Sequence, residues 1–205
     1  EALRLVQRSG QPQLLSSLLD TISDIVTAEA LQLEWRGRFE PDRSLYMKVI
    51  RGKTAVLFRW GFEAGATLAG LSEVQVESLK QAGMALGEAF QLIDDVLDLE
   101  GESTETGKAL FTDLREGKLT WPLILAAEQV DGFVDQVRSC MSHQSGLDSQ
   151  SAVVQTLRRC GALDATRQLA AERVAFAQAR LETLPPGQAR DALDLLARTV
   201  VERKG

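Results

Sequence analysis

The segment Phe90–Asp98 carries polar side chains at helical spacing. Gln91, Asp94, Asp95 and Asp98 are separated by steps of three and four, so a helix would place them on one face. Carboxylates this close repel, and each like-charge pair weakens an isolated helix by about 0.2–0.5 kcal/mol. A helix with three of them needs a cation, and hard oxygen ligands without His or Cys favour Mg²⁺. The pattern predicts a Mg²⁺ site that brings an anionic substrate to an acidic chain.

Two glycine–lysine pairs follow these carboxylates. Gly107-Lys108 and Gly117-Lys118 flank Asp113 in a segment rich in Gly, Thr, Ser and charge. A lysine beside a glycine can approach a phosphate without steric obstruction. Each lysine alone is more often a surface residue, and the carboxylates alone could be a solvated acidic face. Together, and beside long apolar runs, they predict a cradle for a diphosphate and Mg²⁺.

A third polar group lies upstream, at Arg51-Gly52-Lys53-Thr54-Ala55. Glycine inside a helix costs about 0.8–1.0 kcal/mol relative to alanine, so a close approach or a kink is expected at Gly52. Lys53 offers a charge and Thr54 a hydroxyl. The P-loop spacing is absent, and a basic patch with a chance glycine is the competing interpretation.

Helical periodicity positions all three groups. No alternating strand pattern competes, so the fold class is predicted to be all-α, in one domain over residues 1–205. A capping box at Ser72 and Gln75 opens the helix that carries the carboxylates, and residues 100–118 are expected to form a loop. The expected helices cover residues 14–35, 45–68, 73–99, 151–159, 162–184 and 188–203, with helical pattern also resuming from about residue 120.

Composition excludes several functions. The net charge of −6 argues against a nucleic-acid binder, which usually carries a basic surplus. His143 is the single histidine, so zinc sites and Ser-His-Asp chemistry are not expected. No apolar run approaches the ~20 residues that span a bilayer. The two cysteines lack metal-ligand spacing and fit reduced thiols, and a cytoplasmic protein is expected.

The order of these motifs resembles the trans-isoprenyl diphosphate synthases, the polyprenyl synthetase family. The matching segments are Glu29-x-x-Gln32-Leu33, Lys53-Thr54-Ala55, Ala89–Asp98, Gly107-Lys108 and Asp113–Leu123. The resemblance implies a bundle of antiparallel helices around a deep apolar cavity. It also implies a Mg²⁺-dependent homodimer that condenses an allylic diphosphate with isopentenyl diphosphate to a longer polyprenyl diphosphate.

The resemblance assigns roles to the charged residues. Asp94, Asp95 and Asp98 match the family's second aspartate-rich motif, with Asp94 as the direct Mg²⁺ ligand. Lys53 and Lys108 would hold the allylic diphosphate.

The resemblance also assigns roles to residues near these aspartates and lysines. Lys118 would lie near the same diphosphate, and Asp113 would support the metal or the lysine. Thr54 and Gln91 would lie beside the reacting carbons, where the family stabilises a carbocation and guides proton loss. Phe90 would support this group.

The family's first aspartate-rich motif has no counterpart upstream of Lys53. We therefore expect that the family's N-terminal helices and its isopentenyl diphosphate site are missing here, and that these 205 residues alone show little activity. Two other functions stay open: a non-catalytic regulatory subunit of a heteromeric synthase, and a terpene cyclase of the same fold.

Overall fold

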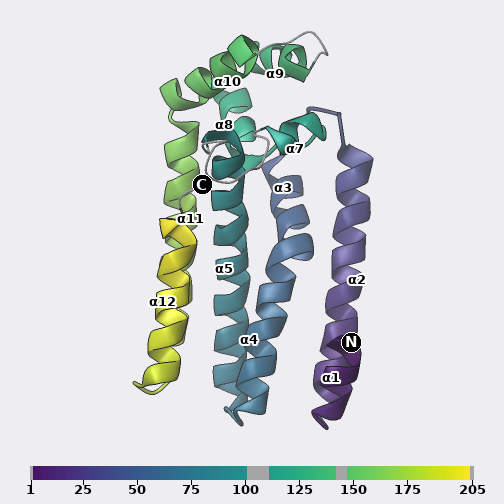
Figure 1. Cartoon of the computed structure of the whole chain (residues 1–205), viewed down its shortest axis with the longest axis vertical. Helices are drawn as coiled ribbons and strands as arrows, with labels where there is room; N and C mark the ends of the chain where they lie inside the picture. Colours follow the sequence, from purple (N-terminus) through teal and green to yellow (C-terminus); the bar gives the residue numbers. More distant parts are fainter. Residues whose placement is uncertain (1, 101–110, 142–146, 204–205) are drawn as a thin grey trace.

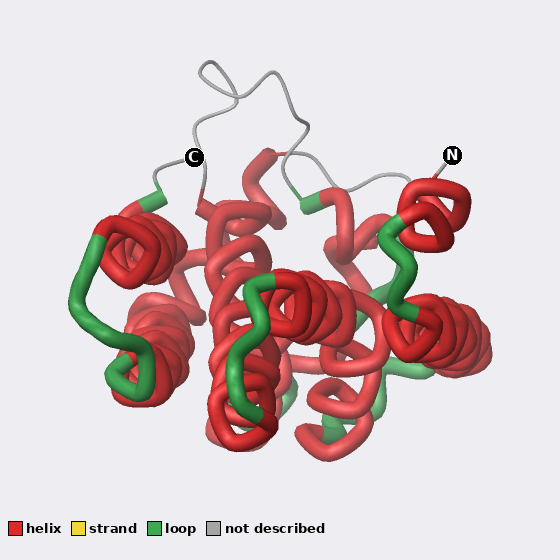
Figure 2. Tube along the Cα trace, turned by 90° about the horizontal axis from the view of Figure 1, so that it is seen from below, coloured by secondary structure: helices red, strands yellow, loops and turns green. Residues whose placement is uncertain are grey.

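A computed structural model describes residues 2–100, 111–141 and 147–203, and every regular element in them is helical (Figures 1 and 2). The prediction of an all-α fold is confirmed for these residues. The elements are α1 (Ala2–Arg8), α2 (Pro12–Trp35), α3 (Arg43–Ile50), the π-helix η1 (Arg51–Ala55), α4 (Val56–Leu68), α5 (Glu73–Glu100), α7 (Thr112–Arg115), α8 (Trp121–Gln129), α9 (Phe133–Met141), α10 (Leu147–Arg159), α11 (Ala162–Leu181) and α12 (Gln188–Glu202).

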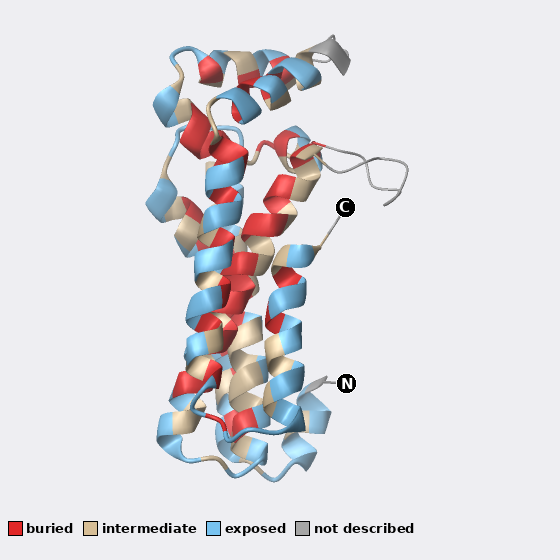
Figure 3. Cartoon of the chain, turned by 90° about the vertical axis from the view of Figure 1, so that its left-hand side faces the viewer, coloured by how far each residue is buried: buried red, intermediate tan, exposed pale blue. Residues whose placement is uncertain are grey.

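Helix α5 runs through the middle of the bundle. Helices α11 and α12 lie on one side of it, and α3, α4 and α2 follow on the other (Figure 1). Its buried residues recur on three- and four-residue steps and include Leu79, Leu86 and Leu92, so the core runs along its length (Figure 3). Burial of each such leucine contributes about 1.5–3 kcal/mol. No helix in the described ranges combines the length and apolarity required to cross a bilayer.

The predicted capping box starts α5. The Ser72 N–H donates to Gln75 Oε1 at 3.1 Å, and the Gln75 N–H donates to Ser72 Oγ at 3.4 Å. At the other end, Glu100 pairs with Arg158 of α10 at 2.8 Å and with Arg167 of α11. The helix that carries the carboxylates is therefore held at both ends.

The predicted helix over residues 45–68 is interrupted by a π-helical turn at Arg51–Ala55. A Cβ on Gly52 would lie 2.8 Å from Ala28 Cβ on α2, so the expected close approach is confirmed. A Cβ on Gly87 would lie 2.4 Å from Ala55 Cα, so α5 packs equally closely on the other side. Two glycines thus let η1 fit between α2 and α5.

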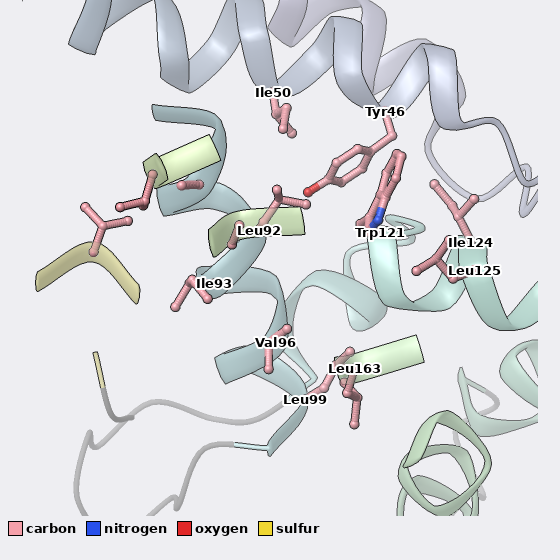
Figure 4. Close-up of a cluster of buried hydrophobic side chains, with 14 of the residues drawn as sticks. Tyr46, Ile50, Leu92, Ile93, Val96, Leu99, Trp121, Ile124, Leu125 and Leu163 are labelled. Carbon is pink, nitrogen blue, oxygen red and sulfur yellow. The ribbon is translucent and has the colours of Figure 1, made fainter. Parts of the chain in front are cut away.

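The expected loop over residues 100–118 is only partly irregular. Helix α5 extends to Glu100, and the short helix α7 occupies Thr112–Arg115. Lys108 and the adjoining glycine lie outside the described residues. Helix α8 then packs on α3, where the Tyr46 and Trp121 rings lie 5.3 Å apart at 47° (Figure 4).

Candidate active site

Helix η1 directs Lys53 toward α2. Lys53 Nζ donates to Gln32 Oε1 at 2.9 Å and pairs with Glu29 Oε1 at 3.0 Å. Glu29 and Gln32 are three residues apart and so share one face of α2. The two side chains hold the ammonium group in a fixed place without removing its charge.

A chain of hydrogen bonds links η1 to α5 beside this lysine. The Thr54 hydroxyl donates to Gln91 Oε1 at 3.1 Å, and Gln91 Nε2 donates to Asp95 Oδ1 at 2.9 Å. Because the amide nitrogen is engaged by Asp95, the amide oxygen faces Thr54. Asp95 therefore sets the orientation of Gln91.

Asp95 points into the core, although the spacing had placed it on one face with Asp94 and Asp98. It is 2% exposed, and its Oδ2 accepts the Tyr46 hydroxyl at 2.5 Å and the backbone N–H of Trp121 at 3.3 Å. Burial raises the pKa of Asp95 to about 7, against the lowering effect of these hydrogen bonds. Its role as a metal ligand stays a prediction, and here both oxygens are engaged by protein donors.

The other two carboxylates of the motif remain accessible. The Asp94 side chain is 40% exposed, and its Oδ1 lies 3.8 Å from Nη2 of Arg203. Asp98 accepts the N–H groups of Thr112 at 3.0 Å and Asp113 at 3.3 Å. Burial raises the pKa of Asp98, and the charges of Asp113 and Asp94 raise it further against those two hydrogen bonds. Negative charge therefore accumulates here.

These residues fit Mg²⁺ better than a softer ion. The donors are carboxylate oxygens, and the charges of Asp94 and Asp113 act on Asp98. Within residues 2–100, 111–141 and 147–203, no three His, Cys, Asp or Glu side chains form a group ready to hold a metal. Mg²⁺ usually takes only one or two carboxylates and completes its shell with water and substrate phosphates. Asp94 and Asp98 are the carboxylates that fit this role.

Lys118 forms a second cationic group on the same side of the bundle. Its Nζ pairs with Asp113 at 2.8 Å and with Glu116 at 2.6 Å. Burial lowers the pKa of Lys118, but the two carboxylates outweigh it, and the pKa ends above its usual value. A cavity of about 60 Å³ lies between Lys118 and Lys53. Its polar lining consists of Gln32, Tyr46, Lys53, Thr54, Gln91, Asp95, Asp113, Lys118 and Thr120.

A larger apolar cavity of about 640 Å³ lies between α4, the first turns of α5 and the start of α12, and it shares no lining residue with the polar cavity. Its lining includes Phe58, whose ring lies 5.5 Å from that of Phe90 at 44°. The Arg203 guanidinium lies 4.4 Å from the Phe90 ring and also neighbours Asp94. Phe90 therefore connects the polar site with the apolar cavity.

Three features of the site were missed from the sequence. Tyr46 is the single tyrosine of the chain, on an otherwise apolar helical face, and that position was a usable signal. The Trp121 N–H and the Arg203 guanidinium reach the site only through the fold. The structure brings together Lys53, Thr54, Phe90, Gln91, Asp94, Asp95, Asp98, Asp113 and Lys118 around the top of α5.

Two curated proteins are similar to the chain in sequence. The chain is 34% identical over 205 residues to the octaprenyl diphosphate synthase of Escherichia coli (strain K12), a match that covers 98% of this chain and 63% of that enzyme. It is 32% identical over 207 residues to the nonaprenyl diphosphate synthase of Mycobacterium tuberculosis, a match that covers 100% of this chain and 61% of that enzyme.

A solved structure shows the same fold. The polyprenyl synthase from Caulobacter crescentus CB15, complexed with calcium and isoprenyl diphosphate, superposes with a TM-score of 0.91 at 33% identity. The match covers 100% of this chain and 63% of that one, so the chain spans less than two thirds of the length of these relatives. The polyprenyl synthetase family model matches residues 1–157. With this match over most of its length, the chain belongs to the polyprenyl synthetase family.

Proposed function

We propose that this chain carries the allylic diphosphate site of a Mg²⁺-dependent prenyltransferase. The reaction condenses an allylic diphosphate with isopentenyl diphosphate to a longer polyprenyl diphosphate. The observation that carries the proposal is that Lys53, Thr54 and Gln91 line one polar cavity, next to Phe90, whose ring contacts Phe58 in the lining of an apolar cavity of about 640 Å³. A substrate with a charged head and a hydrocarbon tail matches both parts of this site. The names of the relatives support the same reaction class.

The lysines would bind the diphosphate. Lys53 is held by Glu29 and Gln32, and a point charge that is already oriented loses little entropy when it meets a phosphate. Lys118 is held by Asp113 and Glu116 in the same way. Lys108 completes the proposed set from the residues that the structure does not describe.

The bond that breaks joins the allylic carbon to a diphosphate oxygen. Thr54 and Gln91 would lie beside the carbon of this bond. The Gln91 oxygen already faces Thr54 because Asp95 engages the amide nitrogen. Fixed dipoles of this kind stabilise developing positive charge without reorganisation during the reaction. The apolar wall formed by Phe58 and Phe90 would keep water from the cation.

Asp94 and Asp98 would hold Mg²⁺, with Asp95 as the carboxylate that orients Gln91. Bound Mg²⁺ neutralises charge on a departing pyrophosphate. The calcium in the Caulobacter crescentus structure supports a divalent cation in this family.

The proposal includes a homodimer. Helix α2 presents exposed apolar side chains at steps of three, four and seven residues, and a second copy would bury them. These residues are Leu19, Ile22, Val26 and Leu33.

The test is binding of an unreactive allylic thiolodiphosphate, measured by calorimetry in the presence of Mg²⁺. We expect Lys53→Ala to weaken binding about tenfold to a hundredfold, because it removes a charge-assisted hydrogen bond. Lys80→Ala is the matched control, since Lys80 pairs with Glu77 on the outer surface of α5. Equal affinity of the two variants, or no binding by the unmodified protein, would rule the proposal out.

A further inference from the structure

A buried carboxylate on α5 connects three helices behind the candidate site. Glu88 is 3% exposed, and its Oε1 lies 2.6 Å from Nε of Arg51 on η1. Its Oε2 lies 3.1 Å from Nε of Arg173 on α11. The arginine side chains are 50% and 33% exposed, so the carboxylate is the buried member of this Glu88 triad (Arg51, Glu88 and Arg173).

Stability alone does not account for a charge at this position. An apolar residue of similar volume often packs as well as a buried ion pair, or better, because both charges lose their hydration. The neighbouring positions Ala85, Ala89 and Leu92 are apolar and buried. A buried ion pair does supply a defined geometry between the elements that it joins.

The element that the triad fixes is the π-helix. Arg51 is the first residue of η1 and lies two positions before Lys53. The last residue, Ala55, packs against Gly87, next to Glu88. Both ends of η1 are thus held by one turn of α5. π-Helical turns are rare, and they occur mostly as single turns inside α-helices, frequently at functional sites.

We propose that Glu88, acting through Arg51 and Arg173, is a positioning residue that fixes η1 so that Lys53 and Thr54 face the site together. The residues of the triad do not line the polar cavity of about 60 Å³, which Lys53 and Thr54 both line. The link to diphosphate binding rests on the function proposed above for Lys53, whereas the link to η1 does not.

Hydrogen exchange measured by mass spectrometry tests the link to η1. In Glu88→Gln, amides of peptides covering residues 51–56 are expected to exchange about tenfold faster, because η1 opens locally at a lower cost. The matched control is Asp194→Asn, which removes a carboxylate that joins α11 and α12 through Gln178. Unchanged exchange in residues 51–56, or an equal increase in all helices, would overturn the proposal.

A second variant guards against misfolding of Glu88→Gln. Arg173→Gln leaves Glu88 paired with Arg51, and Arg173 itself lies on α11, remote in sequence from η1. Faster exchange in residues 51–56 of this variant would support transmission through Glu88. An effect confined to α11 would contradict it.

A double-mutant cycle tests the link to Lys53, with pyrophosphate and Mg²⁺ as the probe. Glu88→Gln is expected to weaken binding about threefold to tenfold alone, and to add little to Lys53→Ala, as for residues in one network. If the losses of binding free energy in Glu88→Gln and Lys53→Ala were additive in the double variant, Glu88 would act on stability rather than on Lys53. If the unmodified protein does not bind the probe, the proposed function fails, while the exchange data still decide whether Glu88 fixes η1.

Discussion

At the scale of single residues, the site separates carboxylates that are adjacent in the sequence. Gln91, Asp94, Asp95 and Asp98 fall within an arc of about 100° on a helix. Asp94 and Asp95 form the two edges of that arc, which explains why one faces solvent and the other meets Tyr46. The sequence predicted the cluster, but the burial of one edge depends on how α3 and α8 pack, and periodicity does not contain that information.

The buried Asp95 predicts a pH dependence of stability in the metal-free protein. Its pKa of about 7 lies above the ordinary value of 3.8, so the folded protein holds a proton that the unfolded chain releases. The contribution of Asp95 to folding stability should therefore fall as pH rises from about 4 to 7, by at most about 1.4 kcal/mol per pH unit. Asp95→Asn should flatten this slope in urea unfolding experiments.

Asp135→Asn serves as the control for that experiment. Its side chain is 81% exposed and pairs with Arg138 on the surface of α9. The control should keep the slope of the unmodified protein. An identical slope in Asp95→Asn would show that Asp95 does not carry a raised pKa.

At the scale of elements, the helix that carries Lys53 differs most from expectation. Gly52 indicated a close approach, and the contact with Ala28 is the physical reason for it. The π-helical turn itself was not predicted, because the shift in hydrogen bonding is imposed by α2 and α5 from both sides. By contrast, the capping box of α5 is local chemistry, so Ser72 and Gln75 predicted its start correctly.

A pair of glycine substitutions tests this packing. Gly87→Ala would place a Cβ 2.4 Å from Ala55 Cα, and overpacking against backbone should destabilise the fold by about 2 kcal/mol or more. Gly61→Ala on α4 meets no atom within 4 Å and should be neutral or stabilising by up to about 1 kcal/mol. Chemical denaturation measures both, and equal stability of the two variants would contradict the close contact.

At the scale of the whole molecule, the all-α bundle followed from periodicity because long helices such as α2, α4 and α12 each carry an apolar stripe. The order of the helices in space did not, since similar stripes can pair in several ways. The two cavities also form only through tertiary contacts: residues from α4, α5 and α12 line the apolar one. Sequence motifs therefore predicted the chemistry of the site better than its shape.

The sequence also predicts what these 205 residues do alone. Upstream of Lys53 there is no paired-aspartate motif to supply the second half of a metal and isopentenyl diphosphate site. We expect the chain to bind pyrophosphate with Mg²⁺ and to show negligible condensation with labelled isopentenyl diphosphate. Robust product formation would show that the second substrate binds to residues present here. A cyclised product without isopentenyl diphosphate would favour a terpene cyclase.

The most direct test of the central claim is a crystal structure of the protein with pyrophosphate and Mn²⁺, which replaces Mg²⁺ and gives an anomalous signal. We predict an anomalous peak bound by Asp94, bridged to the pyrophosphate, with Arg203 displaced from its present position near the carboxylate. Asp94→Asn should remove the peak. A structure with pyrophosphate and no cation at Asp94, or with Asp94 still beside Arg203, would show that Asp94 is not a metal ligand.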